Sequence, residues 1–152
     1  MRRRALLLGP LLLAACGFVP AYGPGGLTGR VAVEAPDTPD GFRLAVALGD
    51  RLGPPGPGAL RLAVTTEVGS EEQGSLPGRG APRLRLEGSA TWRLLGPGNE
   101  VRAEGVEVAS ASAPLSGPAA SVRAAEAEAR ARLMAALADR IVAQLILKGA
   151  AP

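Results

Sequence analysis

Apolar and polar residues alternate with a period of two in several stretches of the chain, which predicts β-strands. The clearest alternation spans residues 83–94, and similar stretches span 60–68 and 101–108. A shorter alternation over 30–34 predicts one more strand ahead of them. Each stretch has one apolar and one polar side, so the sheet that they form should bury only one of its faces.

The last of these strands changes phase at Gly105. Val101 and Ala103 are the apolar positions before this glycine, whereas Val106 and Val108 are the apolar positions after it. One extra residue at a glycine is typical of a β-bulge. We therefore predict a bulge at Gly105, with Val106 and Val108 facing the core.

Two stretches have the period of an α-helix instead. The first follows Thr38, a typical N-cap, with Pro39 at its first position, and it ends before Gly53, a typical C-cap. Its apolar positions are Phe42, Ala45, Val46, Leu48, Gly49 and Leu52. The second runs from about 118 to 147, with Ser121 as a candidate cap. Its apolar positions are Ala125, Ala129, Leu133, Leu137, Ile141 and Leu145, with Met134 and Val142 beside them.

The predicted elements follow the order β-α-β-β-β-α, which indicates an α+β fold. Strands with one apolar face need a cover, and the two helices can supply it from the same side. We expect a four-stranded mixed or antiparallel sheet with two helices packed on one face. Trp92 lies on the apolar side of its strand, so we expect it in the core.

The composition excludes several kinds of active site. The chain has 152 residues, no histidine and one cysteine. Without histidine there is no Ser-His-Asp or Cys-His activation and no histidine-containing metal site. One cysteine cannot form an intramolecular disulfide or a cysteine-rich metal site. Glu71 and Glu72, the adjacent acidic pair in a predicted loop, lack further ligands at metal spacing. We expect no enzymatic activity, no catalytic residues, no cofactor and no metal.

The N-terminus resembles a bacterial lipoprotein signal. Arg2–Arg4 precede an apolar run, and this run ends in Leu13-Ala14-Ala15-Cys16, which resembles a lipobox. The resemblance implies that Cys16 receives a diacylglyceryl group, that the chain is cut before it, and that the new amine is acylated with a fatty acid such as palmitate. Because residue 17 is glycine rather than aspartate, it also implies sorting to the outer membrane.

The same signal explains the net charge of +3. Cleavage before Cys16 removes three of 17 basic residues and leaves 14 basic against 14 acidic residues. Bulk charge therefore offers no argument for binding nucleic acid. We divide the chain into a signal peptide (1–15), a lipid-anchored extended segment (16–28), one α/β domain (29–148) and a tail (149–152).

Two segments resemble a known family. Residues 16–23, Cys-Gly-Phe-Val-Pro-Ala-Tyr-Gly, resemble the mature start of the LPS-assembly lipoproteins of the LptE family. Residues 138–145 resemble the end of that family's final helix. The resemblance implies a lipoprotein on the periplasmic side of the outer membrane that plugs the β-barrel LptD during lipopolysaccharide assembly, with direct lipopolysaccharide binding as a further expectation.

A second class of lipoprotein has similar features. The auxiliary lipoproteins of lipid-transporting ABC systems share the size, the lipobox and a mixed sheet with helices. The partner distinguishes the two readings: a large β-barrel for the first, and a transporter linked to the inner membrane for the second.

Four arginines are candidate contacts for lipopolysaccharide or for the lumen of the barrel. Arg83, Arg85, Arg93 and Arg102 lie on the polar sides of the last two predicted strands. Lipopolysaccharide carries phosphates and carboxylates, which arginine binds with two hydrogen bonds. The alternative is a solvated face that Glu87, Glu100 and Glu104 neutralise.

The hairpin loop decides how these arginines pair. A two-residue turn at Gly98-Asn99 places Arg93 opposite Glu104 but needs a backbone N–H that Pro97 lacks. A four-residue loop over 96–99 avoids this difficulty and places Arg93 opposite Arg102, where an anion or a diagonal acid must compensate.

Phe18 and Tyr22 lie between the predicted anchor and the first strand, where no core requires them. They can rest at the membrane interface or dock on a partner protein. The family resemblance favours docking on the barrel.

Overall fold

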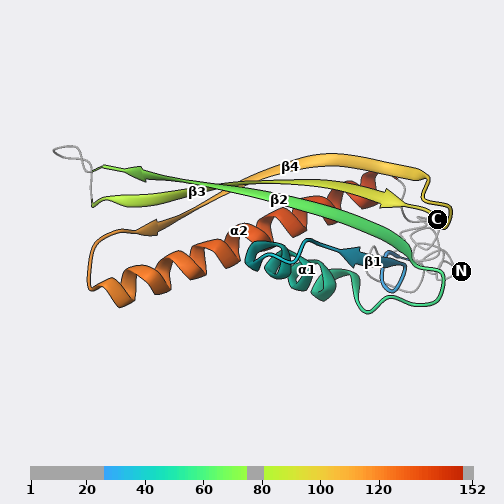
Figure 1. Cartoon of the computed structure of the whole chain (residues 1–152), viewed down its shortest axis with the longest axis horizontal. Coiled ribbons are helices and arrows are strands. Elements are labelled where there is room, and N and C mark those ends of the chain that lie inside the picture. The colour runs from blue at the N-terminus through green and yellow to red at the C-terminus, as the bar shows by residue number, and fades with distance from the viewer. Residues whose placement is uncertain (1–25, 75–80, 149–152) are drawn as a thin grey trace, which may run out of the picture.

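The predicted order of elements is confirmed. The computed structural model describes residues 26–74 and 81–148. Its elements are β1 (Val31–Glu34), α1 (Pro39–Leu52), β2 (Leu60–Gln73), β3 (Arg83–Leu95), β4 (Val101–Pro114) and α2 (Ala119–Leu147) (Figure 1). The strands lie in the order β1-β2-β3-β4. β1 pairs in parallel with β2, and the other pairs are antiparallel, so the sheet is mixed.

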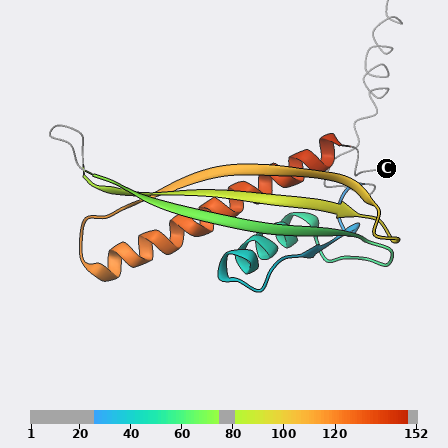
Figure 2. The same ribbon diagram turned by 45° about the horizontal axis from the view of Figure 1, so that its top comes forward.

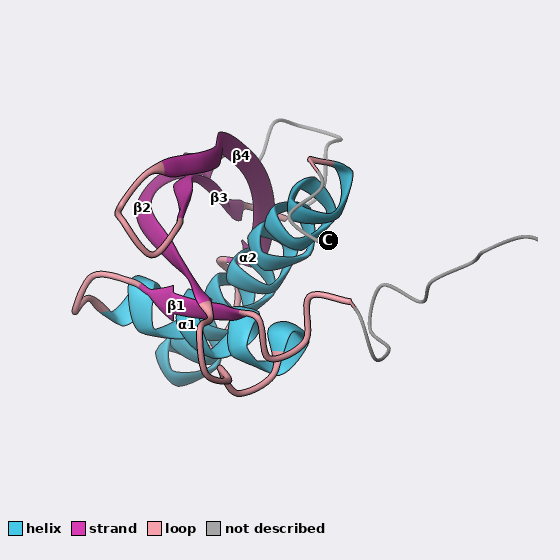
Figure 3. Ribbon diagram, turned by 90° about the vertical axis from the view of Figure 1, so that its right-hand side faces the viewer, coloured by secondary structure: helices cyan, strands magenta, loops and turns pink. Residues whose placement is uncertain are grey.

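Both helices cover the same face of the sheet, as the sequence predicts (Figure 3). α2 runs beneath β3 and β4 for most of their length, and α1 lies beside it below β1 and β2 (Figures 1 and 2). The helices also pack on each other. Trp92 is fully buried, as expected, and belongs to one core cluster with leucines from the sheet and both helices.

The ends of α1 are as predicted, but its buried side is not. The Gly41 N–H donates to Thr38 Oγ1 at 3.0 Å, and Gly53 ends the helix with a φ of 71°. Among the large side chains, the buried ones are Leu44, Leu48 and Leu52, whereas Phe42 and Val46 are 68% and 48% exposed. The prediction that Phe42 and Val46 face the core is wrong. Leucines spaced by four residues form one narrow stripe that fits between the sheet and α2.

β4 has no bulge at Gly105. This residue pairs regularly with Trp92, and the register shifts instead between Leu94 and Leu95, which pair with Ala103 and Val101. Arg102 is therefore the extra residue. Inward and outward positions therefore alternate without interruption across Gly105. This residue points inward, where the indole of Trp92 occupies the space that a side chain at this position would need.

As a consequence, the inner side of β4 carries small residues apart from Glu107, and its outer side carries valines. Ala109 and Ala113 are buried against α2, whereas Val106 and Val108 are 60% and 56% exposed. The prediction that these valines face the core is wrong. Small side chains let a helix approach a strand closely, so alanines rather than valines suit the side beneath α2.

Two further boundaries differ from the prediction. β2 continues to Gln73, so Glu71 and Glu72 lie in a strand rather than in a loop. α2 has Pro118 at its N-cap position with no side-chain hydrogen bond, so Ser121 is not the cap. The apolar stripe predicted for α2 is confirmed, with Ala129, Leu133, Leu137, Ile141 and Leu145 buried.

Candidate functional site

The structure separates the four candidate arginines into two pairs on the face of the sheet that neither helix covers, called the uncovered face here. Arg83 and Arg85 lie near the start of β3, whereas Arg93 lies near its end, close to the β3–β4 turn and Arg102. Eight residues of strand separate Arg85 from Arg93, a distance of about 26 Å. One phosphate group therefore cannot bridge the two pairs.

The register places Arg93 opposite Glu104. The turn spans residues 96–100, where the Gly96 N–H donates to the Glu100 carbonyl at 2.9 Å. Arg102 is an extra residue in β4, which shifts the register next to the turn. The turn therefore needs no backbone N–H from residue 97, and Pro97 fits at this position. The favoured four-residue loop, with Arg93 opposite Arg102, is therefore wrong. The like-charge contact that it implied does not occur.

Three of these arginines pair with exposed acids. Arg85 Nε lies 2.8 Å from Glu87 Oε1, Arg93 Nε lies 3.4 Å from Glu104 Oε2, and Arg102 Nε lies 3.4 Å from Glu100 Oε1. Arg83 donates to Ser112 Oγ at 3.3 Å. Exposed pairs of this kind contribute little to stability, because water screens the charges. A ligand that offers a phosphate can therefore compete with these carboxylates for the guanidinium groups.

Glu100 has a structural role in the turn at the end of this face. Its Oε2 accepts the Gly98 N–H at 2.9 Å. The hydrogen bond from its own backbone N–H, followed by those from Gly98 and Arg102, holds the pKa of Glu100 below its usual value. Glu100 therefore stays ionised and fixes the turn beside Arg102.

An apolar strip lies between the two arginine pairs. It consists of Val106 and Val108, and Val101 lies further along β4. Sequence reasoning missed this strip because it assigned Val106 and Val108 to the core. The regular alternation of the alanines Ala103, Ala109, Ala111 and Ala113 is the signal that could have identified it. The uncovered face thus combines cations with exposed apolar surface, which suits an amphiphilic anion.

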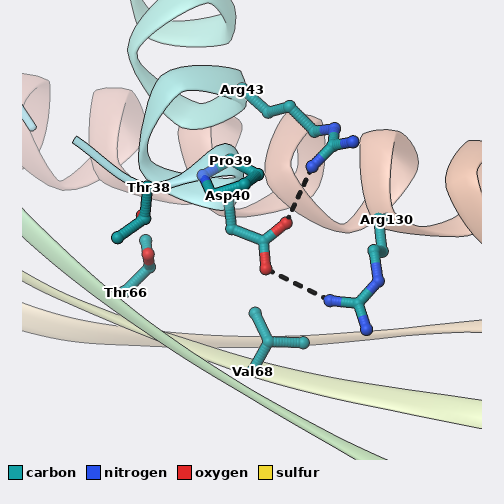
Figure 4. A pocket seen from close by; sticks show the side chains of 7 residues that line it. All are labelled: Thr38, Pro39, Asp40, Arg43, Thr66, Val68 and Arg130. Carbon is teal, nitrogen blue, oxygen red and sulfur yellow. Dashed lines mark hydrogen bonds and ion pairs between the residues drawn. The ribbon is translucent and has the colours of Figure 1, made fainter. Parts of the chain in front are cut away.

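A second candidate is a hollow of about 450 Å³ between the start of α1, the inner side of β2 and α2 (Figure 4). Asp40 lies at its centre and accepts from Arg43 Nη1 at 3.1 Å and from Arg130 Nη1 at 3.2 Å. Arg130 also donates to Glu126, at 3.3 Å from Nε and 3.2 Å from Nη2. The two arginines are matched by two acids, so the hollow joins α1 to α2 and leaves no surplus charge for a ligand.

A groove on the outer side of the helices is the third candidate. Phe42 and Val46 of α1 line it together with Ala131 and Ala135 of α2. Arg51 closes one end and ties the helices together, since it donates to Asp139 Oδ1 at 2.6 Å and to the Ala135 carbonyl at 3.3 Å. This groove is shallow and largely apolar.

The remaining predicted sites lie outside the described residues. These are the lipobox residues Leu13, Ala14 and Ala15, the lipidation site Cys16, and the docking residues Phe18 and Tyr22. Within residues 26–74 and 81–148, no group of three or more potential metal ligands is present. Neither of the two helices described there has the length and apolarity required to span a membrane.

Three solved structures with a similar fold are described as lipoproteins. A crystal structure described as that of a lipoprotein from Caulobacter crescentus matches with a TM-score of 0.62 and 22% identity, over 82% of this chain and 94% of that one. A minor lipoprotein from Acinetobacter baumannii matches with a TM-score of 0.54 and 17% identity, over 78% and 91%.

Rare lipoprotein B from Shewanella oneidensis matches with a TM-score of 0.50 and 12% identity, over 79% of this chain and 96% of that one. The chain therefore shares its fold with these three proteins. It covers almost the whole of each of these structures, so the similarity extends over the complete fold and not over a part of it. No family model and no curated protein sequence matches the chain.

Proposed function

We propose that this protein is a lipid-anchored lipoprotein of the outer membrane that supports an LptD-type β-barrel in lipopolysaccharide assembly. The observation that carries the proposal is the juxtaposition of a lipobox and the sequence Cys-Gly-Phe-Val-Pro-Ala-Tyr-Gly (residues 16–23) with a fold shared by lipoproteins. The anchor segment meets the fold at Leu27, which is buried beside β1. A short tether of this length keeps the domain close to the membrane surface.

The uncovered face of the sheet supports a role in contact with lipopolysaccharide or with the barrel. Lipopolysaccharide combines anionic sugars and phosphates with acyl chains. The two arginine pairs can bind the anionic groups, and Val106 and Val108 offer apolar surface between them. The opposite face is covered by helices, so the sheet face is the surface left open for this contact.

Copurification tests the proposed partner. The full chain, tagged at its C-terminus and expressed in its own cell envelope, should retain a large β-barrel protein through detergent extraction, and mass spectrometry identifies it. Depletion of the protein should lower the lipopolysaccharide that reaches the cell surface. Normal surface lipopolysaccharide after depletion would contradict the proposal. Copurification with an inner-membrane-linked transporter would support the ABC-system alternative.

Paired substitutions test the proposed lipopolysaccharide contact. Because the arginine pairs lie about 26 Å apart, R83S/R85S and R93S/R102S should lower the affinity for lipopolysaccharide separately, and the two losses should add in the fourfold variant. Arg30→Ser with Arg123→Ser, two exposed arginines outside β3 and β4, is the matched control. Unchanged affinity in the fourfold variant would end the hypothesis.

A further inference from the structure

β4 is an edge strand, and it is long. It contains 14 residues, and within the part of the chain that the structure describes it has a neighbour on one side only, β3. In an antiparallel pair, successive residues direct their backbone groups alternately toward the partner and away from it. The carbonyls of Glu104, Val108 and Ser112 accept hydrogen bonds from side chains of α2 and of its C-cap residue Lys148, so they point to the free side. By the same alternation, the backbone groups of Val106 and Ser110 also point to the free side.

These three side chains are all cations. Arg132 Nη2 donates to the Ser112 carbonyl at 3.2 Å. Arg140 Nη1 donates to the Val108 carbonyl, and Lys148 Nζ donates to the Glu104 carbonyl. The donors recur every eight residues along α2, and the acceptors recur every four residues along β4. We call Arg132, Arg140 and Lys148 the cation row.

The spacing follows from the geometry of the two elements. Eight residues of α-helix rise about 12 Å, and four residues of strand rise about 13 Å. The two repeats therefore stay in step while α2 runs antiparallel to β4. The three hydrogen bonds are spread along the free edge from Glu104 to Ser112.

Without the cation row, the edge would suit pairing with a copy of itself. An antiparallel pair about a two-fold axis at Val108 places Val108 opposite Val108 of the second copy. It also places Val106 opposite Ser110 and Glu104 opposite Ser112. No like charges meet in this register, and the exposed Val108 side chains of the two copies lie opposite each other. The strand's own side chains therefore do not prevent self-pairing.

We propose that the cation row closes the free edge of β4 against pairing with β4 of a second copy of this chain. Each cation occupies a carbonyl that the incoming strand requires, and the charged groups at the edge would have to be desolvated by that strand. β1 covers β2 only from Leu60 to Ala63, so the remainder of β2 is a second uncovered edge, and the test must distinguish the two.

The test removes the cation row and measures the oligomeric state. The variant R132A/R140A/K148A of the full chain is compared with the parent by analytical ultracentrifugation in a density-matched detergent. The parent should remain monomeric at every concentration. The variant should rise toward twice the monomer mass with increasing concentration, and its β4 amides should gain protection from hydrogen exchange.

Three further variants separate edge pairing from other causes. R132K/R140K/K148R keeps the charges and should stay monomeric, and so should Arg123→Ala, which removes an α2 cation outside the row. Val108→Pro in the triple variant removes one N–H from the free edge without removing a bond to β3, so it should restore the monomer. A triple variant that remains folded and monomeric would overturn the proposal, as would dimerisation that Val108→Pro does not reverse.

Discussion

At the scale of single residues, Gly105 and Trp92 explain why β4 keeps its phase. The two residues are register partners on the inner side of the sheet. A Cβ atom at position 105 would lie 2.9 Å from Cζ2 and 3.0 Å from Nε1 of the indole. The Trp92 Nε1 atom is buried without a hydrogen-bond acceptor among the described residues, and Lys148 Nζ lies 5.0 Å from the ring centroid. The ring thus needs the space that the glycine leaves.

Gly105→Ala should therefore destabilise the protein by about 1–3 kcal/mol, because the added methyl group overpacks the core against the indole. Urea unfolding followed by the fluorescence of Trp92, the chain's only tryptophan, measures the change. Gly69→Ala is the matched control in β2, where the nearest atom to an added Cβ is the Glu87 carbonyl oxygen at 4.0 Å. Equal effects of the two substitutions would contradict this account of the core.

Asp139 gives a second prediction at this scale. The hydrogen bond from Arg51 is the main cause that lowers the pKa of Asp139 in the folded chain. A lowered folded pKa means that the ion pair stabilises the fold at neutral pH and that this stabilisation is lost as the pH falls through the lowered value. Because the Asp139 side chain is 66% exposed, the contribution should be below about 1 kcal/mol.

A double-mutant cycle of Arg51→Gln and Asp139→Asn measures this contribution directly. The coupling energy should be present at about pH 7 and should decrease once the pH falls below about 4, where aspartate begins to protonate. Denaturant unfolding at a series of pH values gives the four free energies. A coupling energy that stays constant to low pH would show that the pair does not act through the charge of Asp139.

At the scale of elements, the ends of α1 depend on residues close in the sequence, whereas its buried side depends on residues far away in the sequence. Its limits follow from residues that act locally: Thr38 caps the first turn, and Gly53 adopts the positive φ that ends the helix. Its buried side depends on what lies opposite. Apolar residues occupy more than one side of this helix, so periodicity alone could not choose between Leu44 and Phe42.

The structure predicts opposite results for these two neighbours. Leu44 is fully buried, so Leu44→Ala should lower the free energy of unfolding by about 2–5 kcal/mol. Phe42 is mostly exposed, so Phe42→Ala should change it by about 0.5 kcal/mol or less. Urea denaturation of both variants is the measurement. A larger loss from Phe42→Ala than from Leu44→Ala would restore the orientation that the sequence pattern suggested.

At the scale of the whole molecule, the proposed function requires a lipid anchor on Cys16, outside the folded domain that carries the uncovered sheet face. Metabolic labelling with palmitate tests the anchor. The label should enter the wild-type protein and be absent from Cys16→Ser, since Cys16 is the only cysteine.

Gly17→Asp is the matched variant for sorting. It keeps Cys16, so it should still incorporate palmitate, but it should move from the outer to the inner membrane on density-gradient separation. Labelling of Cys16→Ser would contradict a lipid anchor on the thiol of this residue. An unchanged position of Gly17→Asp would contradict the sorting role proposed for residue 17.

The sequence by itself determined the order of the elements, the caps of α1, the buried side of α2 and the burial of Trp92. These properties depend on turn chemistry and on periodicity within one segment, which local residues specify. It also contained the resemblances to a lipobox and to the LptE family, which rest on contiguous residues.

Only the tertiary structure decided the phase of β4, the pairing of Arg93 with Glu104, the exposure of Phe42, Val106 and Val108, and the cation row on the edge of β4. Each of these depends on contacts between distant segments: the ring of Trp92 against Gly105, α2 against the alanines of β4, and helical repeats of eight residues in step with strand repeats of four. A local pattern cannot specify such contacts. Alternation along a strand is compatible with burial of either side, and the element that packs against the strand decides which side is buried.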